Sequence, residues 1–115
     1  MYNMEITNFG NFGRLRFLII KGKRLGGLNQ IENEKAIIHL VKELGLIDSY
    51  KKETNLKGIP DFICVRGEKD IWVEVKLNQD GLRIDQIDWI LKNYEKEILI
   101  IFYNESNYEV LENEP

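Results

Sequence analysis

The chain has 115 residues, of which 43% are hydrophobic and 30% charged, a composition typical of one globular domain with one hydrophobic core. Its longest apolar run, Ile98–Tyr103, is far shorter than the roughly 18 residues that a membrane-spanning helix needs, and no signal-peptide pattern is seen. The single cysteine excludes an internal disulfide. We therefore expect a cytoplasmic, intracellular protein with no membrane association.

The net charge of −3 conceals an uneven distribution along the chain. Residues 1–30 carry a net charge of +4, whereas residues 31–115 carry −7. A protein that coats nucleic acid nonspecifically is more often basic overall, so the balance argues against that class. It is compatible with an enzyme that gathers carboxylates around a metal and keeps a local basic patch.

A β-hairpin is predicted at the N-terminus, with strands over 2–8 and 14–21. The connecting segment Phe9–Gly13 has the glycine and asparagine content of a hairpin loop. A basic, flexible connection follows over Lys21–Gly27. Residues 1–28 are thus expected to form an extra hairpin and a basic loop ahead of the main domain.

A helix is predicted from Asn29 or Gln30 to Leu44, because apolar residues recur there at helical spacing and Gly45 follows in the position of a C-terminal cap. Downstream, the pattern predicts a strand over 46–53, a loop over 55–60, strands over 61–66 and 71–77 joined by a turn over 67–70, a break over 78–81, a helix from 82 or 83 to 94, a buried strand over 98–103, and a short edge strand over 108–111.

The order helix, three strands, helix, strand predicts an α/β domain in which helices flank a central mixed sheet. The second helix is expected to place its apolar side chains on one side; these are Ile84, Ile87, Ile90 and Leu91.

Charged side chains occupy two predicted strands where valine or isoleucine would be usual. Because side chains alternate across a strand, Glu74 and Lys76 share a face with Trp72, and Asp61 shares a face with Ile63 in the preceding strand. If these strands pair as a hairpin, Asp61 and Glu74 lie close together at one end of the sheet. Adjacent carboxylates repel unless a cation lies between them, and such oxygen ligands suit Mg²⁺. The alternative is exposed charge on a half-solvated sheet, since Glu-x-Lys alone is a weak motif.

Taken together, Pro60-Asp61 and Glu74-Val75-Lys76 resemble the signature of the PD-(D/E)XK nuclease superfamily. The flanking segments GIPDFI, IWVEVK and GLRIDQIDWI resemble the VRR-NUC branch and the archaeal Holliday junction resolvases, over about residues 30–103. Two departures weaken assignment to this branch more than assignment to the superfamily. The chain has Val65-Arg66-Gly67 where that branch has Val-Arg-Arg, and Arg83 where a serine is usual.

The resemblance implies a single-domain restriction-endonuclease-like fold, with an αβββαβ core over residues 29–103 and a C-terminal tail or edge strand over 104–115. It implies Mg²⁺-dependent hydrolysis of DNA phosphodiester bonds, with Mn²⁺ as a substitute and 5′-phosphate products. The implied metal ligands are Asp61, Glu74, the backbone carbonyl of Val75, and Glu34 directly or through water. Lys76 would orient or help deprotonate the attacking water, with Gln86 in support.

Helical spacing bears on which helix carboxylate joins this site. Glu34 is followed at the offsets of three and four residues by Ile37 and Ile38, so it is expected to face the sheet, whereas Glu32 leads into a polar face. We favour Glu34, and Glu32 remains the alternative. Gln86 precedes Trp89 and Ile90 at the same offsets and is expected near the inward side of its helix.

Basic and aromatic side chains near the N-terminus are candidates for DNA contacts. The phosphate-contact candidates are Arg14, Arg16, Lys21, Lys23, Arg24, Lys51, Lys52 and Lys57, with a solvated surface as the alternative. Tyr2, Phe9, Phe12 and Phe17 could stack on bases, but packing of the hairpin onto the domain is the favoured role. His39 is expected at the surface, and Cys64 is expected to be a buried strand residue.

The expected substrate is branched DNA such as a Holliday junction, cut by a homodimer that meets either through the hairpin or through the helix carrying Trp89. Two alternatives are a single-strand, flap or nicking nuclease of the same superfamily, and a non-catalytic DNA-binding protein on a nuclease-like scaffold. The isoleucine- and asparagine-rich composition suggests an AT-rich genome, such as that of a virus or mobile element.

Overall fold

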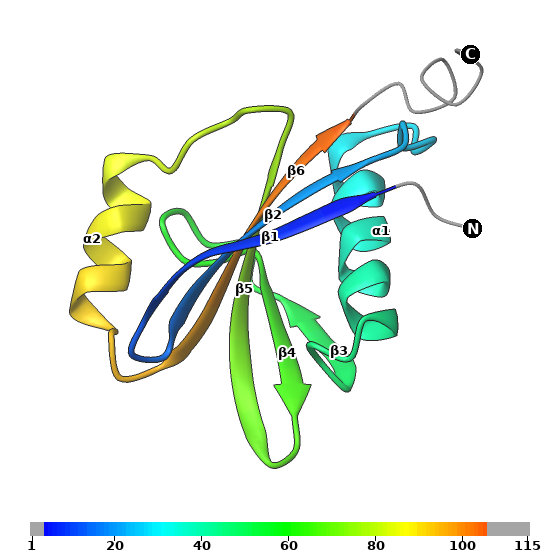
Figure 1. The fold of residues 1–115 in the computed structure, drawn as a ribbon. Helices are drawn as coiled ribbons and strands as arrows, with labels where there is room; N and C mark the ends of the chain where they lie inside the picture. The colour runs from blue at the N-terminus through cyan, green and yellow to red at the C-terminus, as the bar shows by residue number, and fades with distance from the viewer. Residues whose placement is uncertain (1–3, 106–115) are drawn as a thin grey trace.

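A computed structural model describes residues 4–105, which form one six-stranded mixed sheet with a helix on each face (Figure 1). The elements in chain order are β1 (Glu5–Phe12), β2 (Leu15–Gly22), α1 (Gln30–Glu43), β3 (Ser49–Glu53), β4 (Phe62–Arg66), β5 (Lys69–Leu77), α2 (Ile84–Lys92) and β6 (Glu97–Glu105). The predicted α/β class with a mixed sheet and flanking helices is confirmed. No described helix is long and apolar enough to cross a membrane.

The strands lie in the order β1-β2-β6-β5-β4-β3. The central strand β6 runs parallel to both of its neighbours, β2 and β5. The pairs β1–β2, β3–β4 and β4–β5 are antiparallel. The N-terminal hairpin is therefore built into the sheet through β2 and is not an appendage beside it.

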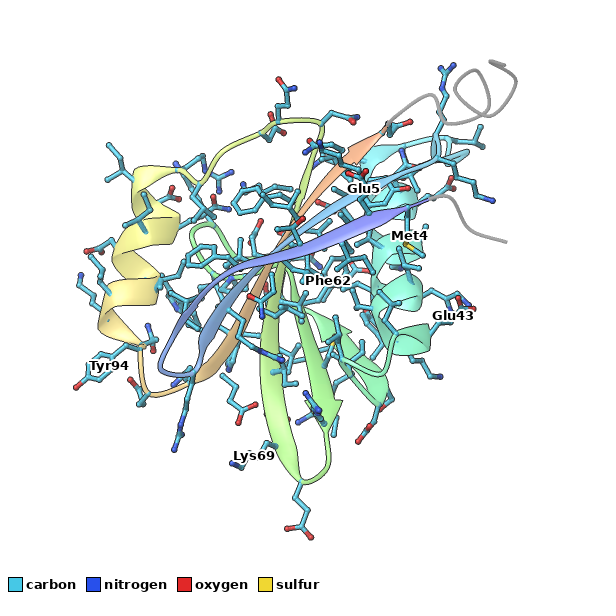
Figure 2. The ribbon with its side chains drawn as sticks, in the orientation of Figure 1. Met4, Glu5, Glu43, Phe62, Lys69 and Tyr94 are labelled. Atoms are coloured by element: carbon cyan, nitrogen blue, oxygen red, sulfur yellow. The ribbon has the colours of Figure 1, made fainter. Side chains whose placement is uncertain are left out.

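The core has two layers, one on each face of the sheet. The α1 layer packs Ile37, Ile38 and Val41 against alternating residues of β2, β4, β5 and β6. The α2 layer is smaller and packs Ile90 and Trp89 against the other face of β2, β5 and β6. Figure 2 shows Phe62, which is fully buried, within the sheet, and Tyr94 and Lys69 at the periphery. This alternation decides which charged side chains can meet.

Helix α1 begins and ends where the sequence predicts. The Asn29 side chain accepts a hydrogen bond from the backbone N–H of Glu32, and so caps the first turn. At the other end Gly45 adopts a φ of +78°, and the amides of Gly45 and Leu46 bond back to Lys42 and Val41. This is the Schellman arrangement, which favours glycine at that position.

The prediction that the four apolar residues of helix α2 face the sheet together is wrong. Ile84 is 86% exposed, Leu91 and Ile87 are also exposed, and only Ile90 of the four is buried. The helix has nine residues, and its orientation is set instead by Trp89, whose ring lies 5.2 Å from that of Trp72. Two large rings outweigh the aliphatic side chains in fixing the contact.

Several element boundaries also differ from the predictions. β1 continues to Phe12, into the predicted loop over 9–13, and its pairing register with β2 shifts between Asn8 and Gly10. β3 starts at Ser49, and Leu46–Asp48 belongs to the irregular connection that follows α1. The turn between β4 and β5 is shorter than predicted and uses Gly67 at a φ of +63°. The predicted strand over 108–111 lies outside the described residues.

Candidate active site

Pairing of β4 with β5 determines where the charged residues of the motif lie. Phe62 is opposite Val73 and Ile63 is opposite Trp72, so Asp61, just before β4, falls opposite Glu74. Glu74 and Lys76 project from the same face of β5, and Lys76 Nζ lies 3.6 Å from Glu74 Oε2. Both residues are buried, with exposed fractions of 3% and 8%. The predicted meeting of Asp61, Glu74 and Lys76 is present in the fold.

Burial raises the pKa of the Glu74 carboxyl from its ordinary 4.5 to about 8. Burial is the largest cause, and the neighbouring Asp61 carboxylate adds to it. The Lys76 ammonium and the backbone of Asp61 offset part of the effect. Without a bound cation, burial beside Asp61 therefore favours the protonated form of Glu74 in the folded protein.

Glu74 also carries a buried oxygen that lacks a partner. Its Oε1 has no hydrogen bond among residues 4–105. The Asp61 carboxyl lies close enough to share a proton with Glu74, but two ionised carboxylates have no donor to place between them. A proton or a divalent cation would satisfy this position, and oxygen donors of this kind suit Mg²⁺.

Asp61 and Glu74 are the two carboxylates that pairing of β4 with β5 brings together. No three His, Cys, Asp or Glu side chains of the described residues already converge as a metal cage. Mg²⁺ is commonly held by one or two carboxylates and keeps several of its waters, so the Asp61 and Glu74 carboxylates suit its usual coordination. Val75 lies between Glu74 and Lys76 with its side chain in the α1 layer, so only its backbone carbonyl is available to this site.

Glu34 reaches the same cluster from α1. It is buried, and its Oε2 accepts a hydrogen bond from Gln30 Nε2 at 3.2 Å. Burial raises the pKa of Glu34, and the Asp61 carboxylate raises it further, against lowering contributions from Gln30 and Lys76. Glu32, by contrast, is exposed, and its Oε2 accepts from the Leu28 amide at 2.6 Å. The inward orientation expected of Glu34 is present, and Glu32 serves the helix start.

Gln86 closes the site from the α2 side. It is buried, and its Oε1 accepts from the backbone amide of Arg83 at 2.9 Å. Gln86 and Glu74 line one crevice with about 160 Å³ of empty space but no position wide enough for a water molecule. The remaining lining residues are Gly58, Pro60, Leu82, Ile90 and Ile100. The Gln86 oxygen is thus engaged at the helix start, and no hydrogen bond within residues 4–105 engages its amide nitrogen.

The proposed phosphate contacts do not form one patch. Arg14 and Arg16 lie at the start of β2, while Lys21, Lys23 and Arg24 lie at its other end, about 20 Å away at the usual strand rise. Lys51, Lys52 and Lys57 are exposed on and after β3, and Lys51 is paired with Asp70 at 3.2 Å.

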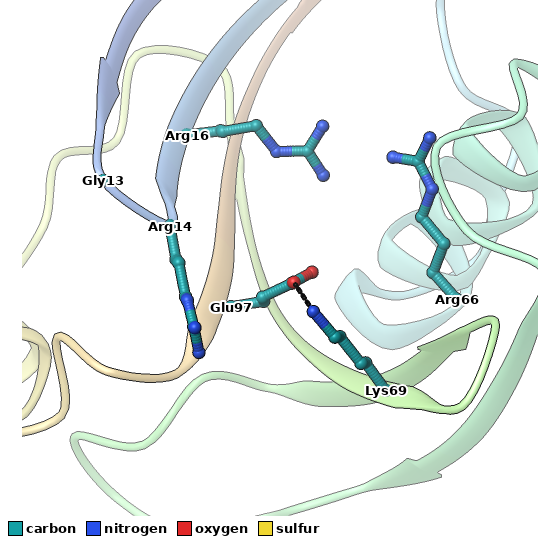
Figure 3. A pocket seen from close by; sticks show the side chains of 6 residues that line it. All are labelled: Gly13, Arg14, Arg16, Arg66, Lys69 and Glu97. Carbon is teal, nitrogen blue, oxygen red and sulfur yellow. Dashed lines mark ion pairs between the residues drawn. The ribbon is translucent and has the colours of Figure 1, made fainter.

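Sequence reasoning missed two basic residues that the fold brings to Arg14 and Arg16. Arg66 and Lys69 flank the β4–β5 turn and line a cavity of about 400 Å³ with Arg14, Arg16, Gly13 and Glu97 (Figure 3). They lie some fifty residues further along the chain, so no local pattern links them to the hairpin. Only the sheet order could have indicated the meeting.

The other residues singled out by sequence lie as follows. His39 is exposed and its Nε2 is 3.1 Å from Glu43 Oε1, and Cys64 is fully buried, as predicted. Phe17 packs in the α2 layer, which agrees with the packing role. Tyr2 and the side chains of Phe9 and Phe12 lie outside what the structure describes.

Comparison of this chain with models of protein families, with curated proteins and with solved structures finds no match.

Proposed function

We propose that this protein is a metal-dependent endodeoxyribonuclease of the PD-(D/E)XK type, with a restriction-endonuclease-like fold. The observation that carries the proposal is the group formed by half-buried Asp61 with buried Glu74 and Lys76, in which Glu74 Oε1 has no hydrogen-bond partner among residues 4–105. Glu34 joins this group from α1. The mixed sheet with one helix on each face is compatible with the proposed fold.

Each side chain has a role that its position supports. Asp61, Glu74, the Val75 carbonyl and Glu34 would hold Mg²⁺ or Mn²⁺, which when bound lowers the pKa of a water and offsets negative charge on a phosphate. The Lys76 ammonium, beside Glu74, would orient the attacking water toward the phosphorus atom. The Gln86 amide would hold the lysine or that water in place. Water then displaces the 3′ oxygen and leaves a 5′ phosphate.

We further propose that two copies of the chain pair through α2 and act on branched DNA, such as a four-way junction. The outer side of α2 presents three exposed apolar residues, Ile84, Ile87 and Leu91. Asp88 and Lys92 on this helix form an ion pair with each other at 2.9 Å, so the apolar residues are the unpaired feature of this side. An antiparallel pair of such helices would bury the apolar residues of both copies around a two-fold axis.

Cleavage assays test the catalytic proposal directly. Labelled four-way junction, flap, duplex and single-stranded DNA are incubated with Mg²⁺ or Mn²⁺ and the wild-type protein, Asp61→Asn, Lys76→Ala or the control Lys42→Ala. Lys42 is exposed on the last turn of α1, away from the cluster. We expect Asp61→Asn and Lys76→Ala to lower the cleavage rate at least about 100-fold, because each removes a group that acts on the reacting atoms. The control should cut at the wild-type rate.

The substrate panel separates the alternatives. Symmetric cuts in the junction support the branched-DNA proposal, whereas cutting of single strands or flaps alone, or nicking of one strand of the duplex, keeps the chemistry and removes junction resolution. If no DNA is cut with either metal while all four proteins bind DNA equally, the non-catalytic scaffold replaces the nuclease.

A further inference from the structure

A basic groove lies on the face of the sheet that carries α1, beyond the part that α1 covers. In this groove Arg16 precedes Leu18, Lys69 precedes Ile71, and Arg66 follows Cys64. Each lies two residues from a core residue of the α1 layer and therefore on the same face of the sheet. The same holds for Glu97, two residues before Leu99. Arg14 completes the lining from the hairpin turn. Figure 1 shows the β4–β5 hairpin extending past the end of α1, which leaves this stretch of the sheet uncovered.

The charges of the groove are not balanced within the protein. Lys69 Nζ lies 3.6 Å from Glu97 Oε1, and Arg14 Nη1 donates to the backbone oxygen of Glu95 at 2.9 Å. Over residues 4–105, no hydrogen bond or ion pair engages the guanidinium of Arg16 or that of Arg66. Figure 3 shows these two guanidinium groups pointing toward each other across the cavity.

Two facing guanidinium groups repel each other, and Arg16 is half-buried, which weakens the screening of its charge. An anion placed between them would remove the repulsion and accept hydrogen bonds from both forks. A tetrahedral phosphate suits this task, because it offers oxygens in several directions to planar guanidinium donors. The cavity of about 400 Å³ is large enough for one or two such groups.

We propose that this groove is a phosphate-binding site, in which Arg16 and Arg66 clamp the backbone of a nucleic acid. It is separate from the carboxylate cluster. Glu74 projects from the opposite face of β5, and Lys69 lies five residues before it, about 17 Å along the strand. The phosphates held in the groove are therefore not the one at Glu74. If the protein is the nuclease proposed above, the groove holds DNA several nucleotides from the cut. Only this placement of the groove relative to the cut rests on the proposed nuclease function.

Binding measured without divalent metal tests the groove apart from catalysis. Fluorescence anisotropy of a labelled duplex and of a labelled four-way junction is followed in EDTA over a series of salt concentrations. The double variant Arg16→Gln/Arg66→Gln is compared with Lys35→Gln/Lys42→Gln, which removes the same charge from two exposed positions on α1. We expect the groove variant to bind about tenfold or more weakly, with a salt dependence reduced by roughly one to two phosphate contacts. The control should match the wild type.

Glu97→Gln supplies a test that misfolding cannot imitate. It removes the one carboxylate that lines the groove and releases Lys69 from its ion pair, so DNA should bind several-fold more tightly. Binding of free inorganic phosphate is tested in parallel. The thermal unfolding of each protein is measured in phosphate and in chloride at equal ionic strength.

The outcomes are distinct. Weaker DNA binding by the arginine variant with tighter binding by Glu97→Gln supports the nucleic-acid clamp, even if no DNA is ever cut. Stabilisation by inorganic phosphate that is lost in the arginine variant, with DNA binding unchanged, keeps a phosphate site and overturns the nucleic-acid clamp. Equal behaviour of wild type, arginine variant and Glu97→Gln in both assays overturns the groove while leaving the nuclease proposal intact.

Discussion

Replacing Glu74 with glutamine should stabilise the metal-free protein, and increasingly so as the pH rises. The folded protein holds a proton on Glu74 up to a pKa of about 8, whereas the unfolded chain releases it near 4.5. The folded state therefore binds more protons than the unfolded state between these two values. Stability contributed by the protonated form is fully present below pH 4.5 and is lost as the pH rises through 8. Glutamine has the same shape and no proton to lose.

The expected gain in stability of Glu74→Gln follows from the difference between the pKa of Glu74 in the unfolded and in the folded protein. At about 1.4 kcal/mol for each pH unit between 4.5 and about 8, the ceiling is about 5 kcal/mol. Relaxation of the site and entry of water reduce this figure, so we expect Glu74→Gln to gain on the order of 2 kcal/mol at pH 9 and close to nothing at pH 4.5. With a usual urea dependence, such a gain moves the unfolding midpoint by about 1 M.

Urea unfolding in EDTA, followed by circular dichroism at pH 4.5, 7 and 9, measures the difference. Glu68→Gln is the matched control, because Glu68 is an exposed residue of the β4–β5 turn, and it should leave the pH profile unchanged. Added Mg²⁺ should stabilise the wild type at pH 8 and should act less on Glu74→Gln, which lacks the ionised ligand. A variant that is less stable than the wild type by the same amount at every pH would refute the buried-carboxylate reasoning.

Three further outcomes are expected. Glu34→Gln should raise the Mg²⁺ concentration for half-maximal cleavage about tenfold, whereas Glu32→Ala should leave cleavage unchanged and lower the free energy of unfolding by about 0.5–1 kcal/mol through loss of its bond to the loop before α1; equal effects on cleavage would contradict the assignment. Light scattering should show that Ile87→Lys/Leu91→Lys converts a dimer to a monomer, and a monomeric wild type at high concentration would remove the α2 interface. Burial raises the pKa of the Cys64 thiol from 9.0 to about 11, so at pH 8 a disulfide reagent should react with the folded protein about 100-fold more slowly than with the unfolded chain; equal rates would show that the thiol is accessible.

The parts of the fold that could be predicted from the sequence are those with strong local signals. The limits of α1 follow from Asn29 and Gly45, which act within one turn of the chain. The extent of β1 and the orientation of α2 could not be predicted in this way. β1 depends on its partner strand, and the inward side of α2 depends on a contact between Trp89 and Trp72, which lies in another element.

The two candidate sites differ in the same respect. Asp61 and Glu74 belong to one hairpin, so alternation and pairing were enough to bring them together. The groove joins Arg16 to Arg66 across β6 and β5, an arrangement that depends on the order of four strands. A sequence pattern carries no direct signal for such a meeting, and the acidic balance of residues 31–115 gave no reason to look for it.

The physical grounds for the two sites are also unequal. A protein domain is usually stable by only about 5–15 kcal/mol, and apolar residues in place of a buried ion pair often stabilise a fold. Glu74 and Lys76 occupy such buried positions next to the α2 layer, so folding alone gives no reason for their charges, and a bound cation and substrate would. The arginines of the groove are at most half-buried and cost the fold little. Their case depends on orientation and on the lack of a partner, and for that reason the gain in binding expected of Glu97→Gln carries more weight than any loss.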